Sequence, residues 1–275
     1  MAGSIKVTKM EEELDRLDLM NEIFSLINNR KLHRAPIGDG AHRILDIGAG
    51  TGSWSIAMGD RYPQAEIIGI DISASAPIWI PPNTRFEIAD IEDEWTFSAP
   101  FDFIYCRYMA GAIKDWPRLI QRSFENLKPG AWAEFADLDI EYYSQDGTLT
   151  EDHAIVRWIE IATRGMEDFG RTLRPGKKLE GWMRDAGFVN LQVVRDPIPV
   201  GPWPKDKKLK RIGLLNFIQL HEGLTGLNVR LFCDFLGWRR EVLDILLMEV
   251  RNDFQNPAIH SIYDMYTVWG QKSEV

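Results

Sequence analysis

The chain has 275 residues, of which 45% are hydrophobic and 27% are charged, and its formal net charge is −9. This composition is that of a globular protein, and the acidic balance argues against the broad basic surface of a nucleic-acid-binding protein. The two cysteines, Cys106 and Cys233, lie far apart without metal-type spacing. We therefore expect neither a disulfide framework nor a metal site.

The first residues lack the apolar core of a signal peptide, and no run of about 18 apolar residues occurs anywhere. We therefore expect a cytoplasmic protein without a membrane partner, or a nuclear one if its role is regulatory. An amphipathic helix is predicted over residues 11–29, where apolar residues recur at helical spacing.

The most informative stretch follows, from Arg43 to Trp54. Apolar residues at 44, 45 and 47 predict a buried strand, and the glycines at 48, 50 and 52 predict a tight turn into a helix over 54–60. Such a turn presents free backbone N–H groups to a bound anion, which favours a nucleotide-type cofactor. The spacing G-x-G-x-G differs from the G-x-G-x-x-G of dinucleotide-binding proteins, so an NAD-dependent oxidoreductase is disfavoured.

A second strand over 66–71 ends in Asp71, which lies 19 residues beyond Gly52. This is close to the separation of about 20 residues expected for an acid that binds ribose hydroxyls. The alternative for Asp71 is the N-cap of a following helix. Further strands are predicted over 85–90, 101–107, 131–139, 189–194 and 265–270, and helices over 114–127, 154–166, 177–186 and 205–252, with a turn at 128–130. The alternation predicts an α/β fold.

The segment Asp46-x-Gly48-x-Gly50-x-Gly52 resembles the first motif of the class I S-adenosylmethionine-dependent methyltransferases. The segments 86–97, 113–117, 201–204 and 266–272 resemble the fungal LaeA-like methyltransferases, and the resemblance runs from about residue 11 to residue 272. It implies a Rossmann-like class I methyltransferase fold, with a seven-stranded, mostly parallel sheet, an antiparallel last strand and helical cap insertions. It also implies S-adenosyl-L-methionine as the cofactor and S-adenosyl-L-homocysteine as the product.

The same resemblance assigns the cofactor site. The acid that ends the third strand, Asp90, would accept from the adenine amino group, and the N–H of Ile91 would reach a ring nitrogen. The alternative for Asp90 is a solvated carboxylate in an acidic run. The implied cofactor-binding residues are Asp46, Gly48, Ala49, Gly50, Gly52, Asp71, Ile72, Asp90, Ile91 and Cys106.

Methyl transfer requires alignment of the acceptor and exclusion of water, and a hydroxyl acceptor also requires a base. The candidate bases are His221 and His153, for which capping or surface roles are the alternative. Arg107, at the end of the fourth strand, is a candidate for holding a substrate carboxylate. The side chains expected to line the pocket at these strand ends are Tyr105, Arg107, Tyr108 and Asp137.

We expect a single methyltransferase domain over residues 1–275, with a helical cap from 9–30, 144–176 and 202–256. The predicted function is methyl transfer to a small molecule in fungal secondary metabolism, with no role for nucleic acid. The alternatives are a LaeA-like regulator that works through protein partners and a cofactor-binding protein that catalyses a non-methylating reaction. The pair Met20-Asn21 departs from the more polar pair of the family, and we expect no long N-terminal extension of the regulator's kind; both weaken the transfer of a regulatory role. The short basic run at 205–211 is interpreted as the solvated first turn of a helix.

Overall fold

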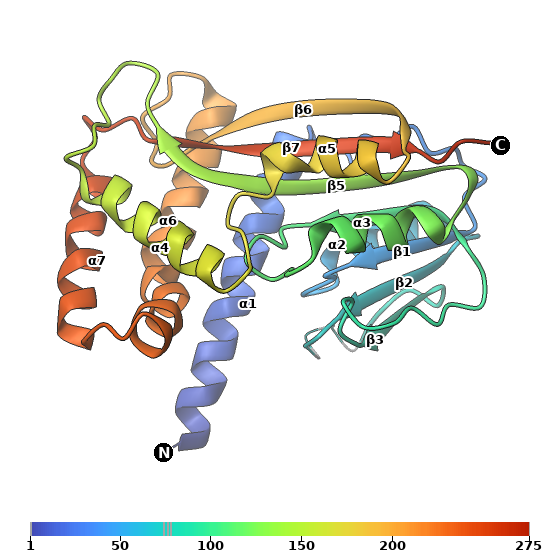
Figure 1. Cartoon of the computed structure of the whole chain (residues 1–275), viewed down its shortest axis with the longest axis horizontal. Helices are drawn as coiled ribbons and strands as arrows, with labels where there is room; N and C mark the ends of the chain where they lie inside the picture. Colours follow the sequence, from blue (N-terminus) through green and yellow to red (C-terminus); the bar gives the residue numbers. More distant parts are fainter. Residues whose placement is uncertain (1, 74, 76, 78, 275) are drawn as a thin grey trace. The chain divides into compact units, whose positions relative to one another are not determined.

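A computed structural model describes residues 2–73, 75, 77 and 79–274, and their side chains from residue 14 onward. The chain forms two compact units (Figure 1). The sheet unit comprises Asn28–Leu138, Pro175–Arg195 and Met265–Val275, and the helical unit comprises Met1–Ile27, Asp139–Arg174 and Asp196–Asp264. The segments expected to form a cap overlap the helical unit, and the prediction of one domain stays a prediction.

Seven strands form one sheet. They are β1 (Arg43–Ile47), β2 (Glu66–Asp71), β3 (Thr84–Ile88), β4 (Phe101–Arg107), β5 (Leu127–Tyr143), β6 (Val189–Pro199) and β7 (Ile262–Gln271). Their order is β3-β2-β1-β4-β5-β7-β6. The pairs β1–β2, β1–β4, β2–β3 and β4–β5 are parallel, and β7 runs opposite to its neighbour β5 (Figure 1). The predicted seven-stranded, mostly parallel sheet with an antiparallel last strand is therefore confirmed.

Helices cover both faces of the sheet in the sheet unit. They are α2 (Ser53–Arg61), α3 (Trp116–Glu125) and α5 (Leu179–Asp185), which follows the short 3₁₀ turn η1 (Gly176–Lys178). Successive residues of a strand point to opposite faces. Accordingly, Ile67 packs in the cluster that contains Met58 of α2, whereas Ile68 packs in the cluster that contains Ile120 of α3. Burial on both faces explains why these strands are continuous apolar runs.

The predicted turn at residues 128–130 is wrong, because these residues belong to β5. The pairing of β4 with β5 shifts register between Phe101 and Phe103, so the strand begins with an irregularity. Gly130 has a φ of 77° and donates its N–H to the carbonyl of Lys272 at 2.9 Å. A turn-like sequence is thus accommodated within a strand by a left-handed glycine and a bulge.

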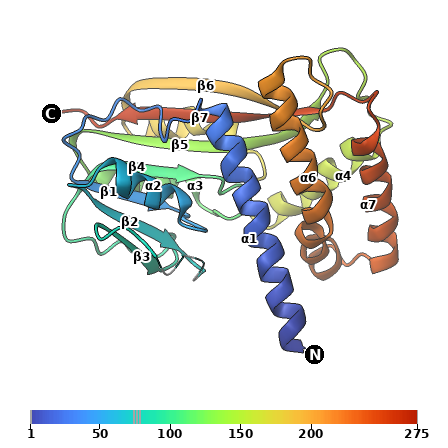
Figure 2. The ribbon, with the colours of Figure 1, turned by 180° about the vertical axis from the view of Figure 1, so that it is seen from behind.

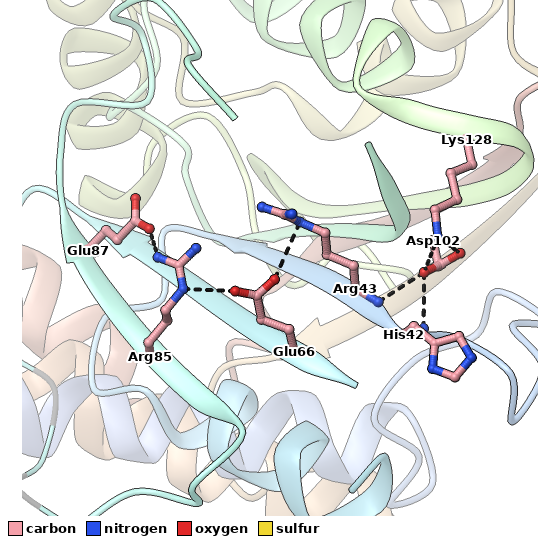
Figure 3. A network of polar contacts seen from close by, with 7 residues as sticks. All are labelled: His42, Arg43, Glu66, Arg85, Glu87, Asp102 and Lys128. Carbon is pink, nitrogen blue, oxygen red and sulfur yellow. Dashed lines mark hydrogen bonds and ion pairs between the residues drawn. The ribbon is translucent and has the colours of Figure 1, made fainter. Parts of the chain in front are cut away.

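A network of polar contacts joins the amino-terminal ends of the first strands (Figure 3). At the right of this view, Asp102 Oδ2 accepts the backbone N–H groups of His42 at 3.0 Å and Arg43 at 2.9 Å. The ammonium group of Lys128 lies 2.7 and 2.9 Å from the two oxygens of Asp102. Asp102 therefore links β1, β4 and β5, while Glu66 of β2 pairs with Arg43 of β1 and Arg85 of β3. The members of the network are His42, Arg43, Glu66, Arg85, Glu87, Asp102 and Lys128.

The helical unit contains α1 (Ala2–Ile27), α4 (Ala154–Asp168), α6 (Lys207–Val229), the π-helical turn η2 (Arg230–Phe235) and α7 (Arg240–Gln255). α1 packs along α6 (Figure 2), and α4 packs against α7. Lys208 Nζ donates to the carbonyl of Ile27 at 3.2 Å, and Arg211 pairs with Glu22 at 3.2 Å. The basic run therefore begins α6 and fastens it to α1. None of the described helices is long and apolar enough to cross a membrane.

Candidate functional site

Three loops meet at the carboxyl edge of the parallel strands. The N–H groups of Gly48 and Ala49, after β1, donate to the carbonyl of Ile70 in β2 at 2.9 and 3.0 Å. The N–H of Ala89, after β3, donates to the carbonyl of Asp71 at 3.1 Å. The structure thus brings together the predicted cofactor residues that follow β1, β2 and β3. Ligands of open α/β sheets bind at this edge.

The glycine loop needs its glycines for two reasons. Gly48, Gly50 and Gly52 have φ values of 73°, 53° and 75°, which side chains rarely adopt. A Cβ on Gly48 would collide with the thioether of Met109, and one on Gly52 would lie 2.5 Å from the ring of Phe86. Gly52 is also the N-cap of α2, so the first N–H groups of that helix have no partner within it. The loop suits close approach of a polar ligand to backbone.

Asp46 lies beneath this loop and is buried. Its Oδ2 accepts the hydroxyl hydrogen of Ser55 at 2.6 Å. Burial raises the pKa of Asp46 to about 6, while the hydrogen bond from Ser55 and the charge of Arg107 act in the opposite direction. The side chain therefore fixes the start of α2 against β1 from inside the protein.

Asp71 is joined to the glycine loop. Its Oδ2 accepts the N–H of Gly50 at 2.9 Å, and its Oδ1 accepts the N–H and the hydroxyl of Ser73 at 2.8 and 2.6 Å. No helix begins in the described residues between Asp71 and β3, so the N-cap alternative does not apply there. A carboxylate has about four lone-pair sites, which leaves capacity on Oδ2 for one more donor. The neighbouring Ile72 is 73% exposed.

The loop after β3 is held by α3. Asp90 is exposed, and its Oδ1 accepts the N–H of Glu92 at 2.9 Å. The side chain of Ile91 is buried in the core, and its carbonyl accepts the indole N–H of Trp95 at 2.9 Å. Arg122 of α3 donates to the carbonyl of Glu92 at 2.7 Å. These contacts fix the loop while the Asp90 side chain stays accessible.

The chain bends sharply after β4. Cys106 is buried, and burial raises the pKa of its thiol well above the usual value, so the side chain is an uncharged thiol. Tyr108 has a φ of 61°, and the N–H of Met109 donates to Asp137 Oδ2 at 2.6 Å. Burial raises the pKa of Asp137 to about 7, against the effect of its backbone hydrogen bonds. Arg107 immediately precedes the bend and lies 5.8 Å from the ring centroid of Tyr105.

Glu134, on β5, is a buried acid that the sequence analysis missed. Its Oε2 accepts the N–H groups of Arg34 and Ala35 at 2.7 and 2.6 Å. Burial raises the pKa of Glu134 to about 7, and these two bonds and the charges of Arg34 and Arg107 oppose the rise. Glu134 thus holds the segment that precedes β1, and no local pattern predicts this because its partners are backbone groups about a hundred residues away.

The same segment packs on aromatic side chains of the sheet unit. The indole N–H of Trp54 donates to the carbonyl of Leu32 at 2.7 Å, and the Trp54 ring stacks on Tyr105 with centroids 4.0 Å apart. His33 Nε2 lies 3.1 Å from the hydroxyl of Tyr62. Burial lowers the pKa of His33, which favours the neutral form of the ring.

The two candidate bases belong to the helical unit, whereas Arg107 belongs to the sheet unit. His221 lies on α6, and its Nε2 is 3.2 Å from the amide nitrogen of Gln255. His153 is the N-cap of α4, and its Nδ1 accepts the N–H of Thr150 at 3.0 Å. His153 occupies the N-cap position of α4, but its side chain makes no capping hydrogen bond to the helix, so its role stays a prediction.

The chain matches a family model described as a methyltransferase domain over residues 16–193. Methyltransferase pytC of Aspergillus terreus is 41% identical over 98% of this chain and 84% of its own length. The secondary metabolism regulator LAE1 of Cochliobolus heterostrophus is 32% identical over 94% of this chain and 86% of its own length.

The fold is also similar to that of a solved structure, Haemonchus contortus phosphoethanolamine N-methyltransferase 2 in complex with phosphomonomethylethanolamine and S-adenosylhomocysteine. The two share 18% identity with a TM-score of 0.51, over 92% of this chain and 52% of that one. At this identity the likeness is one of fold, and this chain spans about half of that protein.

Proposed function

The chain belongs to the LaeA-like S-adenosylmethionine-dependent class I methyltransferases, and we propose that it methylates a small molecule of secondary metabolism. The observation that carries the proposal is the joining of Asp71 to the glycine loop through the N–H of Gly50 at 2.9 Å. One carboxylate and one backbone turn are thereby fixed together at the ligand-binding edge of the sheet.

The residues at this edge fit the cofactor. A side chain at Gly48 or Gly52 would collide with Met109 or Phe86, so the loop is bare backbone at these two positions. Asp71 Oδ2 retains capacity for a ribose hydroxyl, and the exposed Asp90 carboxylate suits an amino group of adenine. We assign the cofactor to the residues Asp46, Gly48, Ala49, Gly50, Gly52, Asp71, Ile72, Asp90, Ile91 and Cys106.

Bound S-adenosylmethionine supplies an electrophilic methyl group on a sulfonium. The protein's task is to orient the acceptor and keep water away. Arg107 is assigned to an acidic group of the acceptor, because it lies at the end of β4, next to the bend at Tyr108. If the acceptor is a hydroxyl, His221 or His153 is the proposed base.

We further propose that the two units act as one methyltransferase domain, with residues 9–30, 144–176 and 202–256 as its cap. Nucleic acid is not proposed as a substrate, because the net charge of −9 opposes phosphate binding. A cytoplasmic location suits an enzyme that acts on small molecules.

The test is mass spectrometry after incubation of the purified protein with trideuteromethyl-labelled S-adenosylmethionine. Two pools of acceptors are offered separately, a fungal metabolite extract and a mixture of fungal proteins. Label in a small molecule supports the proposal, and its position gives the acceptor atom and so decides whether a base is needed. An Asp71→Ala variant should incorporate less label when S-adenosylmethionine is below saturation. A product without a methyl gain would instead indicate a non-methylating reaction.

A regulatory role is the second candidate, and the match to LAE1 over 94% of this chain favours it. In that case the label would enter protein only, or no label would be transferred although the cofactor binds. Either result would overturn the small-molecule proposal.

A further inference from the structure

A separate cavity of about 390 Å³ lies wholly within the helical unit. It is bounded by the end of β6, the first turn of α6 and the start of β7. Ligand pockets in proteins commonly measure about 300–1,000 Å³, so this one suits a molecule of one or two rings. Most of its wall is hydrocarbon, from Pro197, Pro199, Trp203, Pro204, Leu209 and Ile262.

One wall of the cavity is a fixed aromatic pair. The rings of Trp203 and His260 stack with centroids 4.6 Å apart and planes 24° from parallel. The indole N–H donates to the carbonyl of Val200 at 3.1 Å. His260 Nδ1 donates to Asp146 Oδ2 at 2.5 Å, and the N–H of His260 donates to Thr148 Oγ1 at 2.9 Å. Each ring is therefore held by its own hydrogen bond. Ligand binding should cost little side-chain conformational entropy at these two residues, because both rings are already fixed.

The lining of the cavity includes one lysine, Lys205, and one acid, Asp206. Asp206, the only acid in the lining, is committed as the N-cap of α6, where its Oδ1 accepts the N–H of Leu209 at 2.8 Å. Lys205 is exposed and makes no ion pair with any side chain in the described part of the chain. Lys205 can therefore pair with an anionic group of a ligand in this cavity.

We propose that this cavity binds a small aromatic carboxylate, with its ring in the apolar interior against the Trp203–His260 wall and its carboxylate paired with Lys205. The ring burial provides the hydrophobic contribution, and Lys205 provides discrimination between charged and neutral ligands. The proposal concerns binding, and it holds whether the ligand is a methyl acceptor or an effector.

The experiment is isothermal titration calorimetry of the whole protein, without S-adenosylmethionine, using two probes of equal shape. 2-Naphthoate carries the charge, and 2-naphthamide is its neutral counterpart. The wild-type protein should prefer naphthoate, and the preference should shrink as salt is raised. Lys205→Gln should weaken naphthoate about three- to fivefold, the scale of an exposed ion pair, and leave naphthamide unchanged. The matched variant Lys207→Gln, an exposed lysine outside the lining, should bind both probes like the wild type.

The aromatic wall is tested with Trp203→Ala and Trp203→Phe. Removal of the ring should weaken both probes by roughly tenfold, and phenylalanine should restore most of the affinity. Circular dichroism identifies a Trp203 variant that does not fold. In that case the proposal is judged by the comparison of Lys205→Gln with Lys207→Gln alone. The proposal is overturned if neither probe binds the wild-type protein, if naphthoate and naphthamide bind equally, or if Lys205→Gln and Lys207→Gln behave alike.

Discussion

The thioether of Met109 occupies the place where a Cβ on Gly48 would stand. Met109 is itself anchored, because its N–H donates to the buried Asp137 at 2.6 Å. A line of contacts therefore runs from β5, through the bend after β4, to the glycine loop. The loop that we assign to the cofactor is shaped from beneath by a side chain and not only by its own sequence.

Gly48→Ala should weaken S-adenosylmethionine binding and destabilise the protein by about 1–3 kcal/mol. The φ of 73° strains any side chain, and Met109 must also move. Calorimetric titration and urea unfolding measure the two effects. Adding Met109→Ala to the Gly48→Ala variant should remove the part of the destabilisation that comes from the steric collision. The part that comes from backbone strain should remain. The control is Gly40→Ala, since a Cβ there meets no atom within 4 Å. Wild-type affinity in Gly48→Ala would contradict the assignment.

Asp71→Ala should weaken S-adenosylmethionine by about 1–3 kcal/mol, the scale of hydrogen bonds to a charged group. The variant also releases the N–H of Gly50, so the loop loses its tie to β2. Asp71→Asn keeps one acceptor oxygen and should lose less. Asp60→Ala, which removes an exposed acid from α2, serves as the matched control and should bind the cofactor normally. Equal affinities for Asp71→Ala and Asp60→Ala would exclude Asp71 from the ribose site.

Local patterns predict the sheet and the cofactor loop because each depends on neighbours in sequence. Glycines at 48, 50 and 52 and an acid at the end of β2 follow from strand periodicity and turn chemistry. Long-range contacts have no such signature. Glu134 was missed because its partners are the backbone N–H groups of residues 34 and 35. The turn predicted at 128–130 lies within β5, where Gly130 donates its N–H to the distant carbonyl of Lys272. The two histidines were chosen by chemistry alone, and their assignment as bases stays a prediction.

Arg107→Lys should raise KM for the methyl acceptor several-fold while the affinity for S-adenosylmethionine stays unchanged. A lysine keeps the charge that acts on Asp46 and Glu134 but loses bidentate pairing with a carboxylate. Steady-state kinetics with the acceptor from the labelling experiment provide the measurement. An unchanged KM would remove Arg107 from acceptor binding, and a loss of cofactor affinity would place it in the cofactor site instead.

Stability should fall as pH rises from about 4.5 to 7. The pKa of Glu134 is raised from its ordinary value of 4.5 to about 7, so the folded state binds a proton that the unfolded state has released. This contribution is fully present below the unfolded pKa and is lost as pH passes the folded one. Glu134→Gln keeps an acceptor for residues 34 and 35 and should flatten the dependence by up to about 3 kcal/mol. Urea unfolding at several pH values measures it, with exposed Glu151→Gln as control. Identical slopes for wild type and Glu134→Gln would contradict the raised pKa.

Asp102→Ala should destabilise the fold without affecting the cofactor. Asp102 accepts two backbone N–H groups and pairs with Lys128, so alanine leaves three donors without this partner at the amino-terminal ends of β1 and β4 (Figure 3). The expected cost is about 1–3 kcal/mol in urea unfolding. The exposed pair of Arg61 with Asp39, 2.9 Å apart, is the contrast, and Asp39→Ala should cost less than about 1 kcal/mol. S-Adenosylmethionine should bind both variants normally, because the carboxyl ends of the strands are unaltered. Reduced cofactor affinity in a stably folded Asp102→Ala protein would show that the two ends of the strands are coupled, contrary to this prediction.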